Sequence, residues 1–506
     1  MVRTAGALPV VKGLCDRLGI AEAVDCFCPI RSVADLTHGQ VFEALVCNRL
    51  TNPRPLSSFT DWGERFAVGE VLGVPPVKLN DDRLGRALDA VSGHLDEILN
   101  LVARRAIEVF GLDLAELHWD VTQLSFTGGY ADQEDGFAQV RYGRTPKRTI
   151  ERQLHAGFWV AGDGAVAFRG QAFDGNTNDV VTVEPALARL DAIRAALPTG
   201  TSPLVVGDSK LLSATNVAAF ERRGLRFLCP QPKNPPLQQR LTALTEGDLV
   251  PLDYAAERHQ GKPSRYFGSA GTTEVGGRTL RALFVLSLDD KEAARKQRDK
   301  HLARAHDEIT SLNRGVPQYT KDAHTLERKA RAKLEKRHVD QLLTLTIDET
   351  DGKPQARLTT NHDTLAAAIQ LDGRYCLVTN DQTLTDDQLF CAYKRQHLIE
   401  SRFTDLKGPI QVRPVFLHTN RRIAALLAVI STALLLYALI ERQVRQGLSH
   451  LTPQQQRLLT SRIGRATGRK ILDQLSDLAT VRVRDGPPRL AQPRPAQQLL
   501  LQLLNT

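Results

Sequence analysis

The stretch Leu114–Gly128, LAELHWDVTQLSFTG, marks the point where the sequence changes from helical spacing to strict alternation. Leu117, Trp119 and Val121 alternate with more polar neighbours, and Asp120 is one of them. Apolar residues with a period of two predict a β-strand, because successive side chains point to opposite faces of a sheet. We therefore expect Asp120 to lie within a strand.

The residues that follow predict more of the same sheet. Two apolar runs flank Gly162-Asp163-Gly164, and glycine accepts the positive φ angles of a tight hairpin turn. Beyond the hairpin we expect a helix (184–197), a short strand that ends at Asp208 (203–209), a helix (213–223) and a last strand (225–231). This order is that of a ribonuclease-H-like core, an α/β fold with a mixed sheet flanked by helices.

A third acidic residue lies far downstream, in the segment Ala392–Lys407, AYKRQHLIESRFTDLK. Read as one helix, this segment places Tyr393, Glu400 and Lys407 at steps of seven, so the three side chains share a face. A lone Glu on an amphipathic helix is usually only a solvated charge. Its combination with an Asp in a strand and an Asp at a strand end favours a chemical role.

Three converging carboxylates suit two-metal phosphoryl transfer. That reaction uses a pair of divalent ions roughly 3.5–4 Å apart. Mg²⁺ prefers oxygen ligands, so Asp120, Asp208 and Glu400 match it better than His or Cys would, and Mn²⁺ can substitute. Separation in the sequence leaves open whether the fold brings the three together.

The chain resembles the DDE transposases of bacterial insertion sequences, in the branch whose ribonuclease-H-like core is interrupted before the Glu by a β-rich insertion. The resemblance runs from about residue 112 to 441 and rests on HWDVT around Asp120, VVGDS around Asp208, the segment FDGNTND, and the spacing of Tyr393, Glu400 and Lys407. One position departs from the family pattern: Gln396 stands where the family has Arg, with Arg395 beside it.

The resemblance implies roles for individual residues. Asp120, Asp208 and Glu400 would be the catalytic residues and would hold two Mg²⁺ ions. DNA contacts would come from Tyr393, Lys407, Arg395, Arg402 and Arg144. The basic tract that contains Arg144 and continues to Lys147 and Arg148 either binds DNA or is an ordinary polar loop.

We expect five regions. These are a helical N-terminal domain that binds DNA ends (1–110), the first part of the catalytic core (111–230), an insertion of strands and charged helices (231–382), the second part of the core with the Glu helix (383–445), and a helical C-terminal region (446–506). The N-terminal helices are equally consistent with a packing module. Residues 291–340 carry 14 Lys/Arg against 8 Asp/Glu, which fits either a solvated helical hairpin or an arm that contacts phosphates.

Composition agrees with a polyanionic partner. The 506-residue chain has 66 Lys/Arg against 57 Asp/Glu, a net charge of +9. Its seven cysteines form no C-x-x-C pair, so we expect a reduced, cytoplasmic protein of the bacterial nucleoid rather than a disulfide or zinc framework. The apolar run 424–440 is better explained as a buried core helix than as a membrane span.

The sequence thus predicts a transposase that binds terminal inverted repeats, acts on double-stranded DNA as a homodimer, and carries out Mg²⁺-dependent cleavage and strand transfer. Two alternatives remain open. One is a non-catalytic DNA-binding regulator derived from a transposase, and the other is a nuclease of the same fold without strand transfer.

Overall fold

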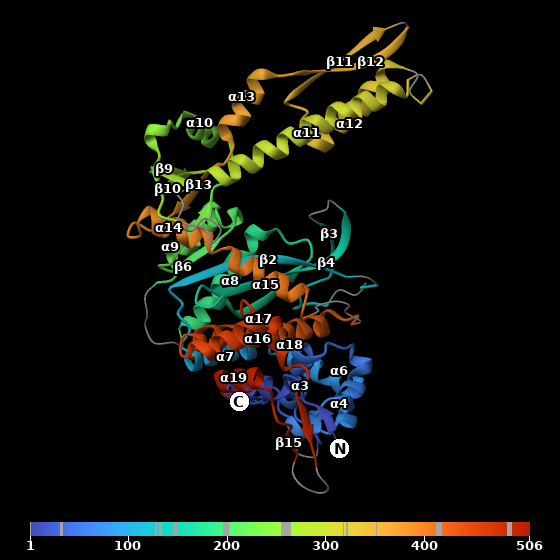
Figure 1. Ribbon diagram of the computed structural model, residues 1–506, viewed down its shortest axis with the longest axis vertical. Helices are drawn as coiled ribbons and strands as arrows, with labels where there is room; N and C mark the ends of the chain where they lie inside the picture. The colour runs from blue at the N-terminus through green and yellow to red at the C-terminus, as the bar shows by residue number, and fades with distance from the viewer. Residues whose placement is uncertain are drawn as a thin grey trace. The chain divides into compact units, whose positions relative to one another are not determined.

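The computed structural model describes residues 2–30, 34–126, 129–130, 134–145, 149–195, 202–254, 265–316, 318–319, 322–350, 352–410, 417–482 and 488–505. The chain folds into two compact units, Met1–Phe227 with Ala392–Thr506, and Leu228–Cys391. Helices and strands occur in both units, so the protein is mixed α/β (Figure 1). Asp120, Asp208 and Glu400 all belong to the first unit.

The N-terminal part of the first unit is helical after one short strand. Its elements are β1 (Val2–Thr4), α1 (Leu8–Leu18), α2 (Ile20–Phe27), α3 (His38–Thr51), α4 (Phe59–Arg65), α5 (Val68–Val71), α6 (Asp81–Ser92) and α7 (Leu95–Phe110). Thr37 begins α3 with a capping box, because its hydroxyl accepts from the Gln40 amide at 3.1 Å and its own amide donates to the Gln40 side chain at 2.9 Å.

The sheet of the first unit contains the predicted strands and one that was not predicted, β3. They are β2 (Glu116–Phe126), β3 (Arg141–Arg144), β4 (Ile150–Ala161), β5 (Val166–Asp174) and β6 (Leu204–Gly207), in the order β3-β4-β2-β6, with β5 also paired to β4. β2 is antiparallel to β4 and parallel to β6. Helices α8 (Asp179–Arg194) and α9 (Ala214–Arg222) connect the later strands, and β7 (Arg226–Pro230) follows.

Helices cover both faces of this sheet. On one face, Trp159 donates its indole N–H to the Ala186 carbonyl of α8 at 3.2 Å. On the other face, Phe158 of β4 packs edge-on against Phe403 of α15 (His397–Lys407), with ring centroids 6.1 Å apart. A sheet covered on both faces explains why β2 is largely buried despite its alternating sequence.

Helix α16 (Asn420–Leu448) forms the centre of the first unit. It contacts β5 and the N-terminal helices α1, α3, α6 and α7, as well as α15 and the C-terminal helices. It is long and apolar enough to cross a membrane, but 94% of its most apolar stretch is buried inside the structure, as expected of a core helix. The N-terminal helices therefore share a core with the sheet instead of forming the separate domain that we expected.

The C-terminal segment was expected to consist of helical pieces that end in a Pro- and Gln-rich stretch, and it contains strands as well as helices. Its elements are α17 (Pro453–Ile463), α18 (Gly468–Leu475), β14 (Ala479–Val481), β15 (Arg489–Leu490) and α19 (Pro495–Leu503). β14 pairs with β1, and β15 pairs with β14, so the two ends of the chain form one small sheet. These strands are too short to show the alternation that identifies a strand in a sequence.

The second unit is the predicted mixed insertion. Its strands β8 (Val250–Pro251), β9 (Tyr266–Val275), β10 (Arg278–Ser287) and β13 (Arg374–Thr379) form an antiparallel sheet that also pairs β13 with β7. Helices α10 (Pro235–Ala243), α13 (His362–Leu371) and α14 (Asp386–Lys394) accompany it. The boundaries at 227/228 and 391/392 differ from the expected 230/231 and 382/383.

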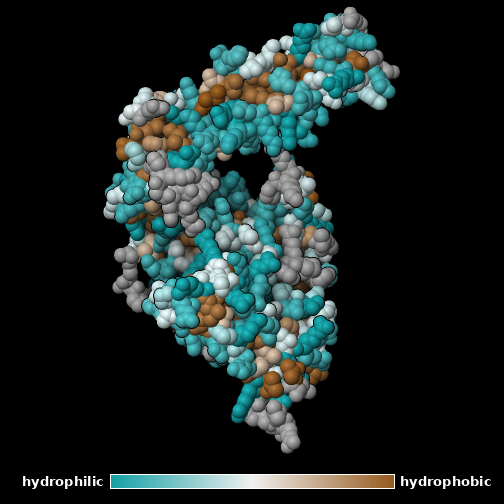
Figure 2. All heavy atoms as spheres, viewed as in Figure 1, coloured by the Kyte–Doolittle hydropathy of each residue, from teal (hydrophilic) through white to brown (hydrophobic). Residues whose placement is uncertain are grey.

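The charged stretch forms a layered subdomain within this unit. The long helix α11 (Leu288–Arg314) lies against α12 (Ala323–Arg337) and the hairpin β11 (Leu343–Thr350) and β12 (Lys353–Thr360) (Figure 1). Two small apolar clusters hold it together, built from Ala305, Leu334, Val339 and Leu343, and from Ile309, Leu326, Ala330 and Ala356. In the view of Figure 2, hydrophilic side chains dominate the surface of α11 and α12. The two predicted helices are therefore confirmed.

Candidate functional site

Asp120 lies in the middle of β2, on the face of the sheet that α15 covers. It is the direct cross-strand partner of Phe158, and paired residues on antiparallel strands point to the same face. Phe158 in turn contacts Phe403 of α15. One carboxylate oxygen of Asp120 accepts from the Val121 amide at 2.7 Å, which restricts its rotation. The helix that carries Glu400 is therefore on the side of the sheet toward which Asp120 points.

Asp208 follows the last residue of β6, at the carboxyl end of a strand parallel to β2. Gly207 lies beside Trp119 in the register of these strands, so the backbones that carry Asp208 and Asp120 are adjacent. The Asp208 carboxylate accepts from the Lys210 amide at 2.8 Å and caps a short 3-10 turn, Ser209–Leu211. The expected place of Asp208 at a strand end is confirmed.

Glu400 is exposed in the first turn of α15. The single helix that we expected over Ala392–Lys407 is wrong, because α14 ends at Lys394 and α15 begins at His397. Tyr393 therefore belongs to α14, whereas Glu400 and Lys407 belong to α15. Apolar periodicity continues across the break, so no local pattern reveals it.

The charges of neighbouring carboxylates act on Asp120 and on Asp208. Burial, helped by the negative charges of Asp208, Asp179 and Glu400 and opposed by the hydrogen bond from Val121, raises the pKa of Asp120 from 3.8 to about 7. Burial also raises the pKa of Asp208, with Asp179 adding to the shift and Lys210 opposing it. Three acidic residues from distant parts of the sequence therefore share one electrostatic environment.

Asp179 is a fourth carboxylate at this place, and the sequence patterns did not single it out. It is the first residue of α8, after the capping residue Asn178. An acidic residue in the first turn of a helix is ordinary, because it faces the positive end of the helix dipole. Only the fold reveals that it influences Asp120 and Asp208.

The donor set fits a hard divalent cation in its chemistry. Asp120, Asp208, Glu400 and Asp179 offer only oxygen, which Mg²⁺ and Mn²⁺ prefer. Within the described residues, however, no group of three His, Cys, Asp or Glu side chains stands in a metal-ligating arrangement. Binding of a cation pair would therefore require these side chains to rotate toward one another.

Arg402, expected to contact DNA, is instead a buried structural residue with 1% of its surface exposed. Its guanidinium donates to the Ala165 carbonyl at 2.7 Å and pairs with Glu441 at 3.0 Å and with Asp405 at 2.9 Å. It thus fastens the β4–β5 turn to α15 and α16. The expectation is wrong because the spacing of a cation in a sequence does not show which face of a helix is covered.

Arg395 also has a partner within the protein. Its guanidinium binds both carboxylate oxygens of Glu116 in β2, with Nε at 2.6 Å from Oε1. Burial raises the pKa of Glu116, but hydrogen bonds from Arg395 and His118 outweigh burial and hold it below its usual value. Arg395 is thus held by an ion pair while 46% of its side chain stays exposed, and its contact with DNA remains a prediction.

The remaining predicted DNA contacts lie on accessible elements. Arg144 is exposed on β3, which pairs only with β4 among the described strands, and Lys407 is exposed at the end of α15. Tyr393 is partly buried near the end of α14. Lys147 and Arg148 lie outside the described residues. Contacts of Arg144, Lys407 and Tyr393 with DNA remain predictions.

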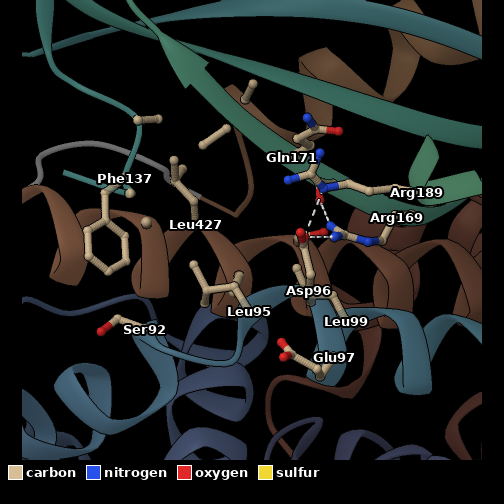
Figure 3. Close-up of a pocket in the computed structure, with 18 of the residues that line it drawn as sticks. Ser92, Leu95, Asp96, Glu97, Leu99, Phe137, Arg169, Gln171, Arg189 and Leu427 are labelled. Carbon is tan, nitrogen blue, oxygen red and sulfur yellow. Dashed lines mark hydrogen bonds and ion pairs between the residues drawn. The ribbon is translucent and has the colours of Figure 1, made fainter. Parts of the chain in front are cut away.

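A cavity of about 260 Å³ lies elsewhere in the first unit, between α7, β5, α8 and α16. Arg169 and Arg189 point toward Asp96 at its wall, with donor–acceptor distances of 2.5 and 2.9 Å (Figure 3). Asp120, Asp208 and Glu400 do not line it. Because its charged groups neutralise one another, this cavity does not offer the carboxylate excess that cations need.

Similarity to known proteins was found in a family model and among solved structures. Residues 1–103 match a family described as Domain of unknown function (DUF4277). No curated protein sequence matches the chain. Among solved structures, the chain is similar to the piggyBac transposase in a synaptic complex with hairpin DNA, at 10% identity and a TM-score of 0.39, over 86% of this chain and 76% of that one.

Proposed function

We propose that this protein is a DDE transposase that cleaves and joins double-stranded DNA with Asp120, Asp208 and Glu400 as its catalytic carboxylates. The observation that carries the proposal is the shared electrostatic environment of three acidic residues separated by 88 and 192 positions in the chain. Holding like charges near one another, with Asp120 and Asp208 partly buried, costs free energy, and this arrangement is typical of functional sites. The spacing of Tyr393, Glu400 and Lys407 supports the same assignment.

The proposed reaction consists of two in-line displacements at phosphorus. In the first, a water oxygen bonds to phosphorus at the element's end and gives up a proton as the P–O3′ bond breaks. The leaving 3′ oxygen takes up a proton to become a 3′-hydroxyl, and the phosphate stays on the 5′ end of the other fragment. In the second, that hydroxyl attacks a phosphodiester of target DNA, so one P–O bond forms as another breaks. Two bound divalent cations would supply stabilisation of the charge that develops on the phosphoryl oxygens.

The protein's own residues have simpler tasks. Asp120, Asp208 and Glu400, with Asp179 beside them, provide negative charge at the face of the sheet where the cations would bind. Lys407 and Arg144 are accessible cations suited to backbone phosphates, which position DNA without reading its sequence. We propose that the protein acts as a homodimer on paired DNA ends in the bacterial cytoplasm.

The test uses the purified protein with DNA that carries the ends flanking its own gene. Asp120→Asn, Asp208→Asn and Glu400→Gln should each abolish Mg²⁺-dependent strand cleavage while end binding persists in a gel shift. Asp473→Asn is the matched control, because that side chain is 71% exposed and pairs only with Arg469 at 3.7 Å among described residues. Cleavage retained in all three variants would refute the assignment.

A non-catalytic regulator is the second candidate, and one observation favours it. The described carboxylates do not stand in a ligating arrangement. A regulator would bind the same ends but cleave nothing with either Mg²⁺ or Mn²⁺. Adding a target plasmid to the assay also separates a transposase from a nuclease, because only the transposase would join the cleaved ends to it.

A further inference from the structure

The turn between α14 and α15 is bound to both strands that carry the catalytic aspartates. Arg395 binds Glu116 of β2, and Gln396 binds the backbone at the end of β6. The first is an ion pair that lies four residues before Asp120, and the second reaches Asp208 itself. We propose that Arg395 and Gln396 are positioning residues that set Glu400 against Asp120 and Asp208.

The Gln396 side-chain amide lies against the peptide group between Gly207 and Asp208. In the amide orientation that gives both groups a complementary partner, its nitrogen lies 3.1 Å from the Gly207 carbonyl oxygen and its oxygen 3.0 Å from the Asp208 amide nitrogen. Asp208 is thereby held at its backbone by Gln396 and at its carboxylate by the Lys210 amide.

The ion pair on the other side joins exposed Arg395 to a partly buried carboxylate. The Glu116 side chain is 16% exposed, and its Oε1 also lies 3.0 Å from the ring of His118, which is fully buried. Glu116, His118 and Asp120 lie two residues apart along β2, so their side chains share one face of the sheet. Arg395 therefore binds a side chain on the same face of β2 from which Asp120 projects.

These contacts account for the break in the helix. Across it the amides bond three residues back: Gln396 to Tyr393 at 3.0 Å, Leu398 to Arg395 at 2.8 Å and Ile399 to Gln396 at 3.2 Å. This tighter turning redirects the backbone. Glu400 follows Gln396 by four residues, about one helical turn, so a shift of the Gln396 contact moves Glu400 directly.

The inference rests on the proposed function, and Gln396→Leu tests it. Leucine has a similar size but removes both hydrogen bonds. We expect kcat for Mg²⁺-dependent cleavage to fall roughly 10- to 100-fold with KM for DNA unchanged, because a small misplacement of a catalytic group has that effect. Amide exchange at Asp208 should accelerate in the same variant. Gln446→Leu, at an exposed position of α16, is the control.

Arg395 provides a second test that separates positioning from DNA contact. Arg395→Lys keeps the charge and can form one bond to Glu116, whereas Arg395→Met forms none. Positioning predicts that kcat falls in the order Arg, Lys, Met at constant DNA affinity. A contact with phosphate predicts weaker binding of DNA by Arg395→Met with kcat preserved, and that result would overturn the inference for Arg395.

The remaining outcomes are also decisive. If the wild type cleaves DNA and Gln396→Leu cleaves at the same rate, positioning is refuted while the proposed function stands. If the wild type cleaves no DNA, the proposed function fails. Positioning is then tested by thermal unfolding with Mg²⁺ as the only added ligand. Positioning then survives only if Mg²⁺ raises the melting temperature of the wild type and of Gln446→Leu but not that of Gln396→Leu.

Discussion

Asp120 shows most clearly how a single residue at this site costs stability. Its pKa in the folded protein is about 7, against 3.8 for an ordinary aspartate. The folded protein therefore binds more protons than the unfolded chain between these values, and stability falls as pH rises through that window. A pKa difference of about three lowers the free energy of unfolding by about 4 kcal/mol at most, and this destabilisation is fully present above pH 7.

Removing this charge should stabilise the metal-free protein. We expect Asp120→Asn to exceed the wild type in free energy of unfolding by about 2–4 kcal/mol at pH 8 in the presence of a chelator, with the difference vanishing near pH 4. Urea denaturation at several pH values measures it. Asp473→Asn should show no such pH-dependent gain, and equal stability of Asp120→Asn and wild type at pH 8 would contradict the prediction.

For Arg402 we expect the opposite effect: removing its charge should lower the stability of the protein, because the charge is paired. Arg402→Ala leaves buried Glu441 with Arg445 in place of two guanidinium partners, and breaking a buried pair costs up to about 3–5 kcal/mol. Chemical denaturation should show this loss, while exposed Arg462→Ala should leave stability nearly unchanged. Unchanged stability of Arg402→Ala with weakened DNA binding would restore the role that we first expected.

The candidate site could be predicted in part at this scale. Strand ends, helix spacing and a family resemblance indicate Asp120, Asp208 and Glu400, whereas Asp179 looks like an ordinary first residue of a helix. Arg395 and Arg402 were expected to contact DNA because a sequence shows charge but not the carboxylates, contributed by distant segments, that surround it.

At the scale of elements, close packing between α16 and β5 organises the first unit. A Cβ added to Gly170 would lie 2.5 Å from the Ser431 hydroxyl and 2.8 Å from the Phe158 ring. We expect Gly170→Ala to lower the free energy of unfolding by about 1–3 kcal/mol, because a packed core accommodates added volume poorly.

The same packing suggests a rescue and a control. Gly170→Ala combined with Ser431→Gly should recover part of the loss, since the nearest clash is removed. Gly93→Ala should be nearly neutral, because the nearest atom to its added Cβ, the Ala90 carbonyl oxygen, is 4.0 Å away. If Gly170→Ala unfolds at the same urea concentration as the wild type, the helix and strand are less tightly packed than the structure indicates.

Elements were predicted well where their pattern was long and poorly where it was short. The apolar run within α16 and the alternating strand β2 carry many residues of one period, so their type was clear. β3, β14 and β15 are too brief for a period to show. The break between α14 and α15 depends on side chains that bind strands more than a hundred residues earlier, which no local pattern encodes.

At the scale of the whole molecule, each unit has its own core. Leu334 is buried in the small cluster of α11, α12 and β11, whereas Leu434 is buried in α16 of the first unit. The sequence predicted the insertion but not that the N-terminal helices share a core with the sheet, because that core depends on contacts of α16 with helices more than three hundred residues away.

Because each unit has its own core, a substitution that creates a cavity in one core should destabilise that unit and leave the other unchanged. Leu334→Ala creates a cavity in a small cluster and should cost about 2–5 kcal/mol there. Hydrogen exchange followed by mass spectrometry should then show faster exchange in peptides from 288–360 and unchanged exchange in β2, β4 and α16. Leu434→Ala should give the reverse pattern. Faster exchange in both units from either single variant would show that the two unfold as one cooperative body, contrary to this division.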